Sequence, residues 1–192
     1  SHTYPAVGTE LTLTNVTLRN NKNVAIGSMG GAIYSDNASL GTDSAPCEGV
    51  VIENCSAVYG GALYQATVNT QSIHFKNSQF NNNMADSGSA IYIADTDSAW
   101  GSSILESCSF TGNRFANSTD NTNTVIKSSV MTLTDSKTDR SSREMVFKGD
   151  ITFKDNTTNS DIVLDENKSK SNTSTLTIPV RSSIAANKGD VI

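Results

Sequence analysis

The sequence predicts an all-β fold in which short strands wind into a parallel β-helix of about six coils. Two motifs recur along the chain. One is an apolar residue followed three positions later by asparagine, as in Phe80 and Asn83, and the other is a pair of small residues before an apolar run, as in Gly88-Ser-Ala-Ile-Tyr92. Alternating apolar and polar residues fill the stretches between, which is typical of β-strands. No stretch has the apolar spacing of an amphipathic helix.

The asparagine motif marks the copies of the repeat. Its apolar and asparagine positions are Leu18/Asn21, Phe80/Asn83, Phe110/Asn113, Phe153/Asn156 and Ile184/Asn187. A degenerate copy after the first would have Ala57 at the apolar position and Gly60 at the asparagine position. Stacked copies would align these asparagines, so that each amide bonds the next one in a ladder.

Two further patterns give the order of elements within each copy. A lead-in of the same form occupies residues 13–18, 52–57, 75–80 and 105–110, and a glycine motif occupies residues 30–34, 60–64 and 88–92. Val125-Ile126 and Ile162-Val-Leu164 would take the place of the glycine motif in the fourth and fifth copies. Paired glycines permit a sharp corner or a close backbone approach.

Coils stacked about 4.8 Å apart would enclose one continuous core. The side chains expected to face inward are Leu13, Leu18, Ile52, Phe75, Phe80, Ile91, Leu105, Phe110, Phe153 and Ile184.

Repeated Gly-Gly-Ala-Ile/Leu together with Phe-x-x-Asn resembles the passenger region of chlamydial polymorphic outer membrane proteins. The resembling positions lie between about residues 11 and 156, at 30–33, 60–63, 80–83, 110–113 and 153–156. The resemblance implies a right-handed parallel β-helix (a solenoid), display on the cell surface by a C-terminal transporter barrel, and adhesion to host cells. Only two intact Gly-Gly-Ala copies occur, and a kindred surface repeat protein would have the same motifs.

The chain is expected to form a single domain over residues 1–192, as a fragment of a larger surface protein. A charged insertion is expected at about 135–144, and a flexible stretch at 165–175. The net charge of −5 argues against a nucleic-acid partner, which needs a basic stripe. Membrane attachment is expected only through a missing region, as the resemblance implies.

Cysteine and histidine predict no cofactor and no metal site. His2 and His74 cannot complete a zinc site with the available cysteines. Cys55 and Cys108 occupy equivalent positions, but about 9.6 Å would separate them, beyond the reach of a disulfide. A Cys47–Cys55 disulfide and buried free thiols both stay open.

Trp100 is the candidate binding residue, because an exposed aromatic side chain often binds sugars or proteins. It could instead cover the side of the helix. His74, between Ile73 and Phe75, is expected to face solvent. Asp95 and Asp97 lack the glycine and glutamate of a calcium loop, so a solvated link is favoured.

No catalytic set is predicted. The acids Asp36, Glu53, Asp95 and Glu106 fall at different phases of their repeats, and Arg140 and Arg143 belong to the insertion. The sequence therefore favours a non-enzymatic, extracellular adhesin segment that binds a protein or glycan of a host or neighbouring cell. A polysaccharide lyase or hydrolase and a structural stalk without a ligand are the alternatives.

Overall fold

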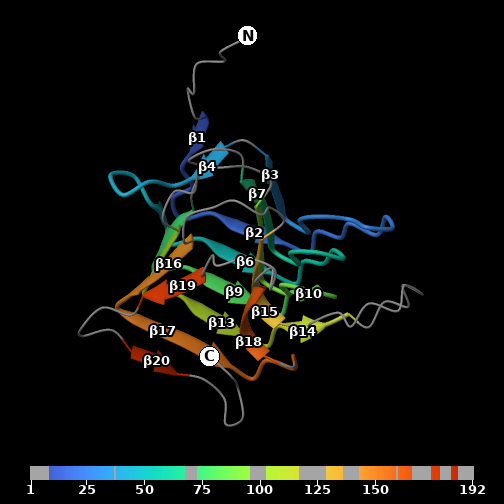
Figure 1. Cartoon of the computed structure of the whole chain (residues 1–192). Helices are drawn as coiled ribbons and strands as arrows, with labels where there is room; N and C mark the ends of the chain where they lie inside the picture. Colours follow the sequence, from blue (N-terminus) through green and yellow to red (C-terminus); the bar gives the residue numbers. More distant parts are fainter. Residues whose placement is uncertain are drawn as a thin grey trace.

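The chain folds as an all-β parallel β-solenoid (Figure 1). The computed structural model describes residues 9–36, 38–67, 73–95, 103–116, 129–135, 143–158, 160–165, 174–177 and 183–185. Every pair of neighbouring strands in these residues is parallel, and no helix occurs among them. A coil is defined as one passage of the chain through the three large sheets.

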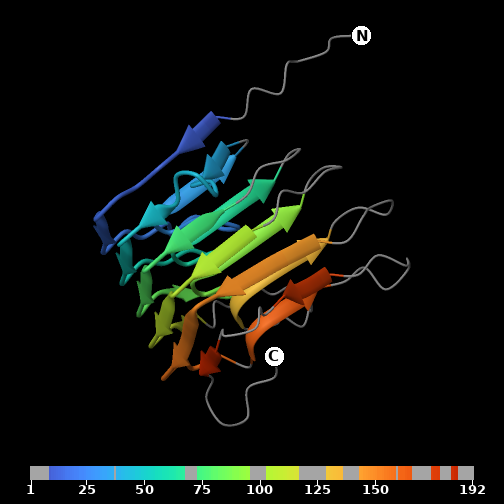
Figure 2. The same cartoon turned by 90° about the vertical axis from the view of Figure 1, so that its left-hand side faces the viewer.

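Each large sheet takes one strand from each successive coil (Figure 2). Sheet I contains β5 (Cys47–Glu48), β8 (His74–Lys76), β12 (Ser103–Glu106), β16 (Arg143–Lys148) and β19 (Ser174–Thr177). Sheet II contains β2 (Thr17–Arg19), β6 (Val51–Glu53), β9 (Gln79–Asn81), β13 (Ser109–Thr111), β17 (Asp150–Lys154) and β20 (Ser183–Ala185). Sheet III contains β3 (Ile33–Asp36), β7 (Leu63–Thr67), β11 (Ile91–Asp95), β15 (Ser129–Asp135) and β18 (Ser160–Asp165).

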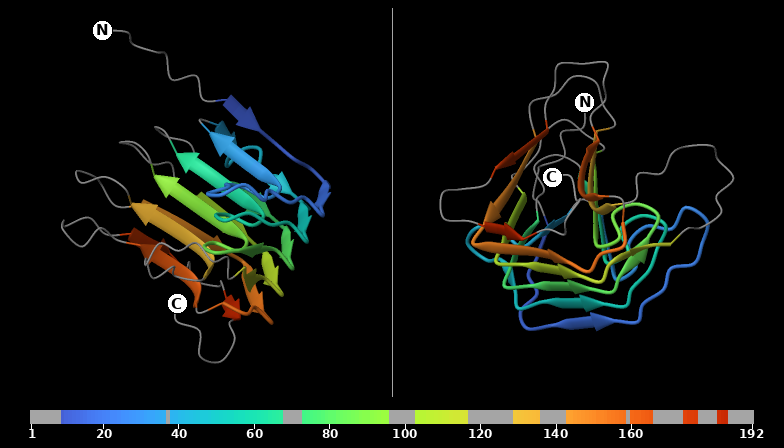
Figure 3. Two further views of the ribbon diagram at one scale, coloured as in Figure 1. Left: turned by 90° about the vertical axis from the view of Figure 1, so that its right-hand side faces the viewer. Right: turned by 90° about the horizontal axis from the view of Figure 1, so that it is seen from below.

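Two smaller strand pairs complete the described architecture. They are β1 (Thr9–Leu11) with β4 (Ala38–Leu40), and β10 (Met84–Ala85) with β14 (Arg114–Phe115). Seen end on, the three large sheets line three sides of the interior, and the loops between sheets II and III project to one side (Figure 3).

Aromatic and aliphatic side chains stack along the interior because the strands are in register. Phe80, Phe110 and Phe153 are opposite one another on β9, β13 and β17. Their ring centroids are 5.0 and 4.9 Å apart, with the rings nearly parallel. Buried aromatic side chains of this size contribute strongly to stability through apolar burial and ring contacts.

The inward positions predicted from the sequence are largely confirmed. Seven are buried: Ile52, Phe75, Phe80, Ile91, Leu105, Phe110 and Phe153. Leu13 and Leu18 are partly buried and pack against this core. The side chain of Ile184 lies outside the part that the structure describes.

The predicted asparagine ladder is confirmed for Asn83, Asn113 and Asn156. The Oδ1 atom of each accepts a hydrogen bond from a backbone N–H of the preceding coil, at 3.0, 3.0 and 2.9 Å. The Nδ2 atom of each donates to a carbonyl of that coil, at 2.9, 2.9 and 3.1 Å. The ladder thus satisfies backbone groups at the corner between sheet II and the following loop. Asn187 lies outside the described residues.

The predicted second copy is wrong in register. Leu18 and Phe80 both pair with Ile52, so Ile52 rather than Ala57 holds the apolar position. Cys55, not Gly60, holds the ladder position, because its N–H donates to Asn83 Oδ1. The second lead-in is therefore residues 47–52 rather than 52–57.

This error has a physical cause: the coil has two corners that need the same backbone conformation. Asn15 and Asn77, before sheet II, have positive φ, and so do Asn54 and Asn82, after it. Asparagine tolerates this left-handed conformation at either corner. The sequence pattern matched Asn54 with Asn77, although Asn54 is equivalent to Asn82.

The glycine motif begins the strands of sheet III, as predicted. Gly60 has a φ of +66°, and a Cβ on Gly61 would come within 2.2 Å of the Ser89 carbonyl oxygen. In the fourth copy, Met131 of β15 pairs with Ile91, so β15 replaces the predicted Val125-Ile126, which lies outside the described residues. The fifth copy is confirmed by the pairing of Ile162 with Met131.

Cys47, Cys55 and Cys108 are free and buried, so the alternative of a Cys47–Cys55 disulfide is wrong. Burial raises the pKa of the Cys108 thiol to about 12, so this thiol stays protonated at neutral pH. The predicted insertion at 135–144 falls mainly on residues outside the described part, and so does most of the stretch at 165–175.

Candidate functional site

The candidate binding residue Trp100 lies outside the described residues, as do Asp97 and Arg140. Binding by Trp100 therefore stays a prediction. Asp95 and Arg143 lie in β11 and β16, and the structure describes only their backbone.

The structure does not bring the described candidate acids together. Asp36 is on β3 of sheet III, Glu53 is on β6 of sheet II, and Glu106 is on β12 of sheet I. A glycosidase needs two carboxylates at a defined separation across one bond. Among the described residues, no group of three His, Cys, Asp or Glu side chains could hold a metal ion.

His74 is buried, which corrects the prediction that it faces solvent. It is 5% exposed, with Nδ1 3.4 Å from Asp43 Oδ1 and Nε2 3.8 Å from Glu106 Oε2. Alternation along β8 correctly predicts that His74 lies on the opposite face of the sheet from the inward Phe75. It could not show that Asp43, after β4, and Glu106, from the next coil, lie on either side of the ring.

Four tyrosines form a cluster on sheet III and the loop before it. Tyr34, Tyr64 and Tyr92 stack with centroids 5.6 and 5.3 Å apart, and Tyr59 meets Tyr92 edge on at 5.3 Å. Burial, followed by the neighbouring tyrosines, raises the pKa of Tyr64 to about 12. The rings mainly pack against one another, and of the four only Tyr34 is more than half exposed.

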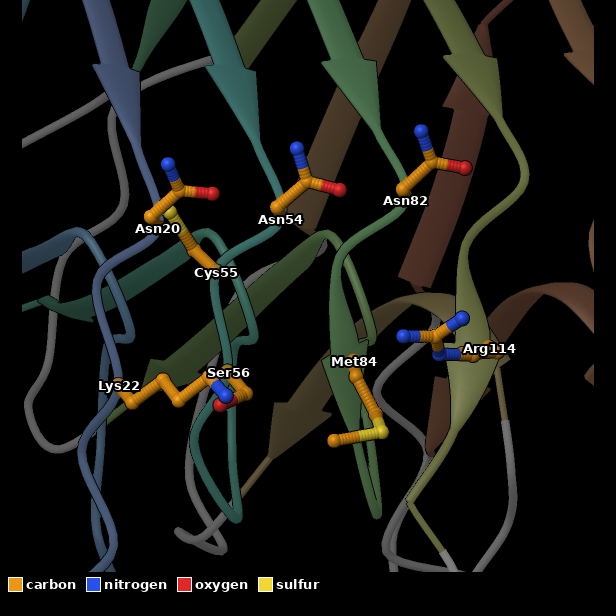
Figure 4. Close-up of a pocket in the computed structure, with 8 residues that line it drawn as sticks. All are labelled: Asn20, Lys22, Asn54, Cys55, Ser56, Asn82, Met84 and Arg114. Carbon is orange, nitrogen blue, oxygen red and sulfur yellow. The ribbon is translucent and has the colours of Figure 1, made fainter.

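A row of three asparagines lies at the outer corner after sheet II. Asn20, Asn54 and Asn82 have φ between 54° and 61°, and the backbone N–H of each bonds the next coil. Their side-chain amides lie side by side in one row (Figure 4). No hydrogen bond of these amides occurs among the described residues. At Gly112, which also has positive φ, the row stops because glycine has no side-chain amide.

Opposite this row, a second set of side chains completes a shallow groove of about 270 Å³ (Figure 4). Lys22, Ser56, Met84 and Arg114 occupy the same position on successive coils, as their strand pairing shows. Lys22 and Arg114 are exposed and form no ion pair among the described residues. We call this feature the asparagine groove. Its lining residues are Asn20, Lys22, Asn54, Cys55, Ser56, Asn82, Met84 and Arg114.

The lining of the asparagine groove is rich in hydrogen-bonding groups. Each amide offers donors and an acceptor, and the two cations add charged donors. Among the described residues that line it, none is a carboxylate or a histidine, the usual general acids and bases. Sequence reasoning missed the groove, although asparagine directly before the ladder position in three coils was the available clue.

The fold and the groove define a parallel β-solenoid with a polar groove on its surface. The sequence matches no protein-family model, no curated protein and no solved structure. Within the described part of the chain, no helix is long and apolar enough to cross a membrane.

Proposed function

We propose that the chain is a non-enzymatic cell-surface adhesin segment that binds a protein or glycan of a host or neighbouring cell. The observation that carries this proposal is the asparagine groove. Three amides without hydrogen-bond partners and two cations without ion-pair partners, among the described residues, converge on one surface. Polar groups that have no partner within the protein are available to a ligand, because a polar group of the ligand then has to replace only water.

The finer description of the fold belongs to the same proposal. We propose a right-handed solenoid of about six coils, in line with the six strands of sheet II and the strong preference of parallel strand crossovers for the right hand. The resemblance to the passenger region of chlamydial polymorphic outer membrane proteins supports display outside the cell, anchored in an outer membrane through a region beyond these residues.

Binding to whole cells tests the proposed function. Replacing both groove cations, Lys22→Ala with Arg114→Ala, should weaken binding to target cells about tenfold or more, because charge-assisted hydrogen bonds are lost. Flow cytometry with labelled protein over a panel of host and neighbouring cells measures this effect. Because both side chains are exposed, the variant should keep the melting temperature of the wild type.

The matched control removes two cations outside the groove, Lys148→Ala with Lys154→Ala, and should bind like the wild type. Equal binding by the groove variant and the control would contradict the proposed site. Absence of binding to every cell type would favour the stalk, and depolymerisation of a bound polysaccharide would favour the enzyme.

A further inference from the structure

We infer that the ligand of the asparagine groove is an acidic glycan chain that lies along the solenoid axis. This inference rests on the proposed binding function and names the class of ligand. It follows from three features of the groove: the direction in which its groups repeat, the places of its charges, and the bonding of the backbone in its walls.

The groups of the groove repeat along the solenoid axis. Asn20, Asn54 and Asn82 follow strands β2, β6 and β9, which are neighbours in sheet II. Neighbouring strands are about 4.8 Å apart, so equivalent amides recur at about this interval. A ligand that contacts all three must extend across the strands, and a chain of repeated polar units meets this requirement.

The two cations stand at opposite ends of the same stretch. Lys22 is in the first coil of the row and Arg114 is three coil steps away, through Ser56 and Met84. The backbones of Lys22 and Arg114 are therefore roughly 14 Å apart. Asp155, further along the corner, lies 4.0 Å from the Lys154 amino group and is not part of the lining. Acidic groups near both ends, with hydroxyls between them, would complement this arrangement.

The walls of the groove favour a glycan over an acidic peptide. A peptide that binds by strand addition needs an unpaired backbone edge. Here the backbone is already paired between coils, as Ser56 N–H donates to Asn21 O, Met84 N–H to Cys55 O and Arg114 N–H to Asn83 O. Met84 is the one large apolar side chain among the described lining residues, so the groove offers mainly polar contacts.

Isothermal titration calorimetry with defined oligosaccharides tests the inference. The probes are a galacturonic-acid hexamer, a sulfated galactan hexamer, the carboxyl-reduced neutral hexamer and a hexaglutamate peptide. We expect at least one acidic hexamer to bind the wild type at least tenfold more tightly than the neutral hexamer and the peptide. The two acidic probes distinguish carboxylate from sulfate as the recognised group. Binding should weaken at high salt, because exposed charges are screened.

Two variants separate the charge from the amides. Lys22→Ala with Arg114→Ala should reduce acidic-hexamer binding to the level of the neutral hexamer. Asn54→Gly with Asn82→Gly, which removes the amides and keeps the left-handed backbone without strain, should weaken binding of all the hexamers. If the neutral hexamer binds as tightly as the acidic ones and only the amide variant weakens it, the acidic class is wrong while the binding function stands. If hexaglutamate binds as tightly, the glycan class is overturned. If target cells bind the wild type through the groove but no hexamer binds, the ligand class is overturned; if neither cells nor hexamers bind, the binding function fails as well.

Discussion

The Phe110→Ala substitution should lower the free energy of unfolding by about 3–5 kcal/mol, the range found for phenylalanine in well-packed cores. Phe110 is fully buried, and its ring stacks on Phe80 on one side and Phe153 on the other. Those rings belong to strands that are hydrogen-bonded in register on both sides of β13, so they cannot move together to fill the space. Urea-induced unfolding followed by circular dichroism measures the change.

The neighbouring residue provides the control for this prediction. Ser109 is on the same strand but is only half-buried, and Ser109→Ala should change the unfolding free energy by less than about 0.5 kcal/mol. A loss below about 1 kcal/mol for Phe110→Ala would mean that the phenylalanine stack does not form the centre of the core.

The Asn113→Leu substitution should cost about 3–5 kcal/mol, although it adds apolar volume to a buried position. It removes the acceptor of the Asn83 N–H and Nδ2 groups and the donor to the Phe80 carbonyl. Each buried group without a partner costs about 1–3 kcal/mol. The same unfolding measurement applies, and an unfolding free energy within about 1 kcal/mol of the wild type would contradict the ladder.

The reverse change serves as the matched comparison. Cys55 holds the ladder position in its coil. Its thiol donates to the Glu53 carbonyl of its own coil at 3.2 Å, but its contacts with the preceding coil, to the Leu18 carbonyl and the Asn21 amide, are long, at 4.0 and 3.9 Å. In Cys55→Asn, the new amide could donate to Leu18 O in the same way that Asn83 donates to Ile52 O. The expected gain is about 0.5–1.5 kcal/mol, one net hydrogen bond. Destabilisation by Cys55→Asn would show that this corner is packed differently from the next three.

The sequence predicted the fold correctly in the copies where the Phe-x-x-Asn motif is intact. Phe80, Phe110 and Phe153, each with its asparagine three residues later, predicted both the stacked core and the ladder. The second copy was misplaced because Asn54 and Asn77 have the same left-handed backbone at different corners. Local sequence gives the conformation of such a residue but not which corner it occupies. The register depends on pairing between coils, which is set by residues about one coil away.

The candidate site was harder to predict than the fold, because its residues come from distant parts of the sequence. Lys22, Ser56, Met84 and Arg114 are far apart in the sequence and become neighbours only through parallel pairing. His74 was misjudged for a related reason, since Asp43 and Glu106 belong to other coils. Alternation within one strand predicts which side of a sheet a residue takes, but not what covers that side.

Engineered disulfides between coils test the parallel register most directly. Gln79 and Ser109 are opposite one another on β9 and β13, so Gln79→Cys with Ser109→Cys places the two Cα atoms about 4.8 Å apart, within the range for a disulfide. Gln79→Cys with Thr111→Cys is two residues out of register, which adds about 6.6 Å along the strand. The native cysteines are buried and should not interfere. We expect oxidation to cross-link the first pair, as detected by mass spectrometry of peptides, and to leave the second pair reduced. Cross-linking of the second pair alone, or of both pairs equally, would contradict the stacked parallel coils on which the core, the ladder and the groove all depend.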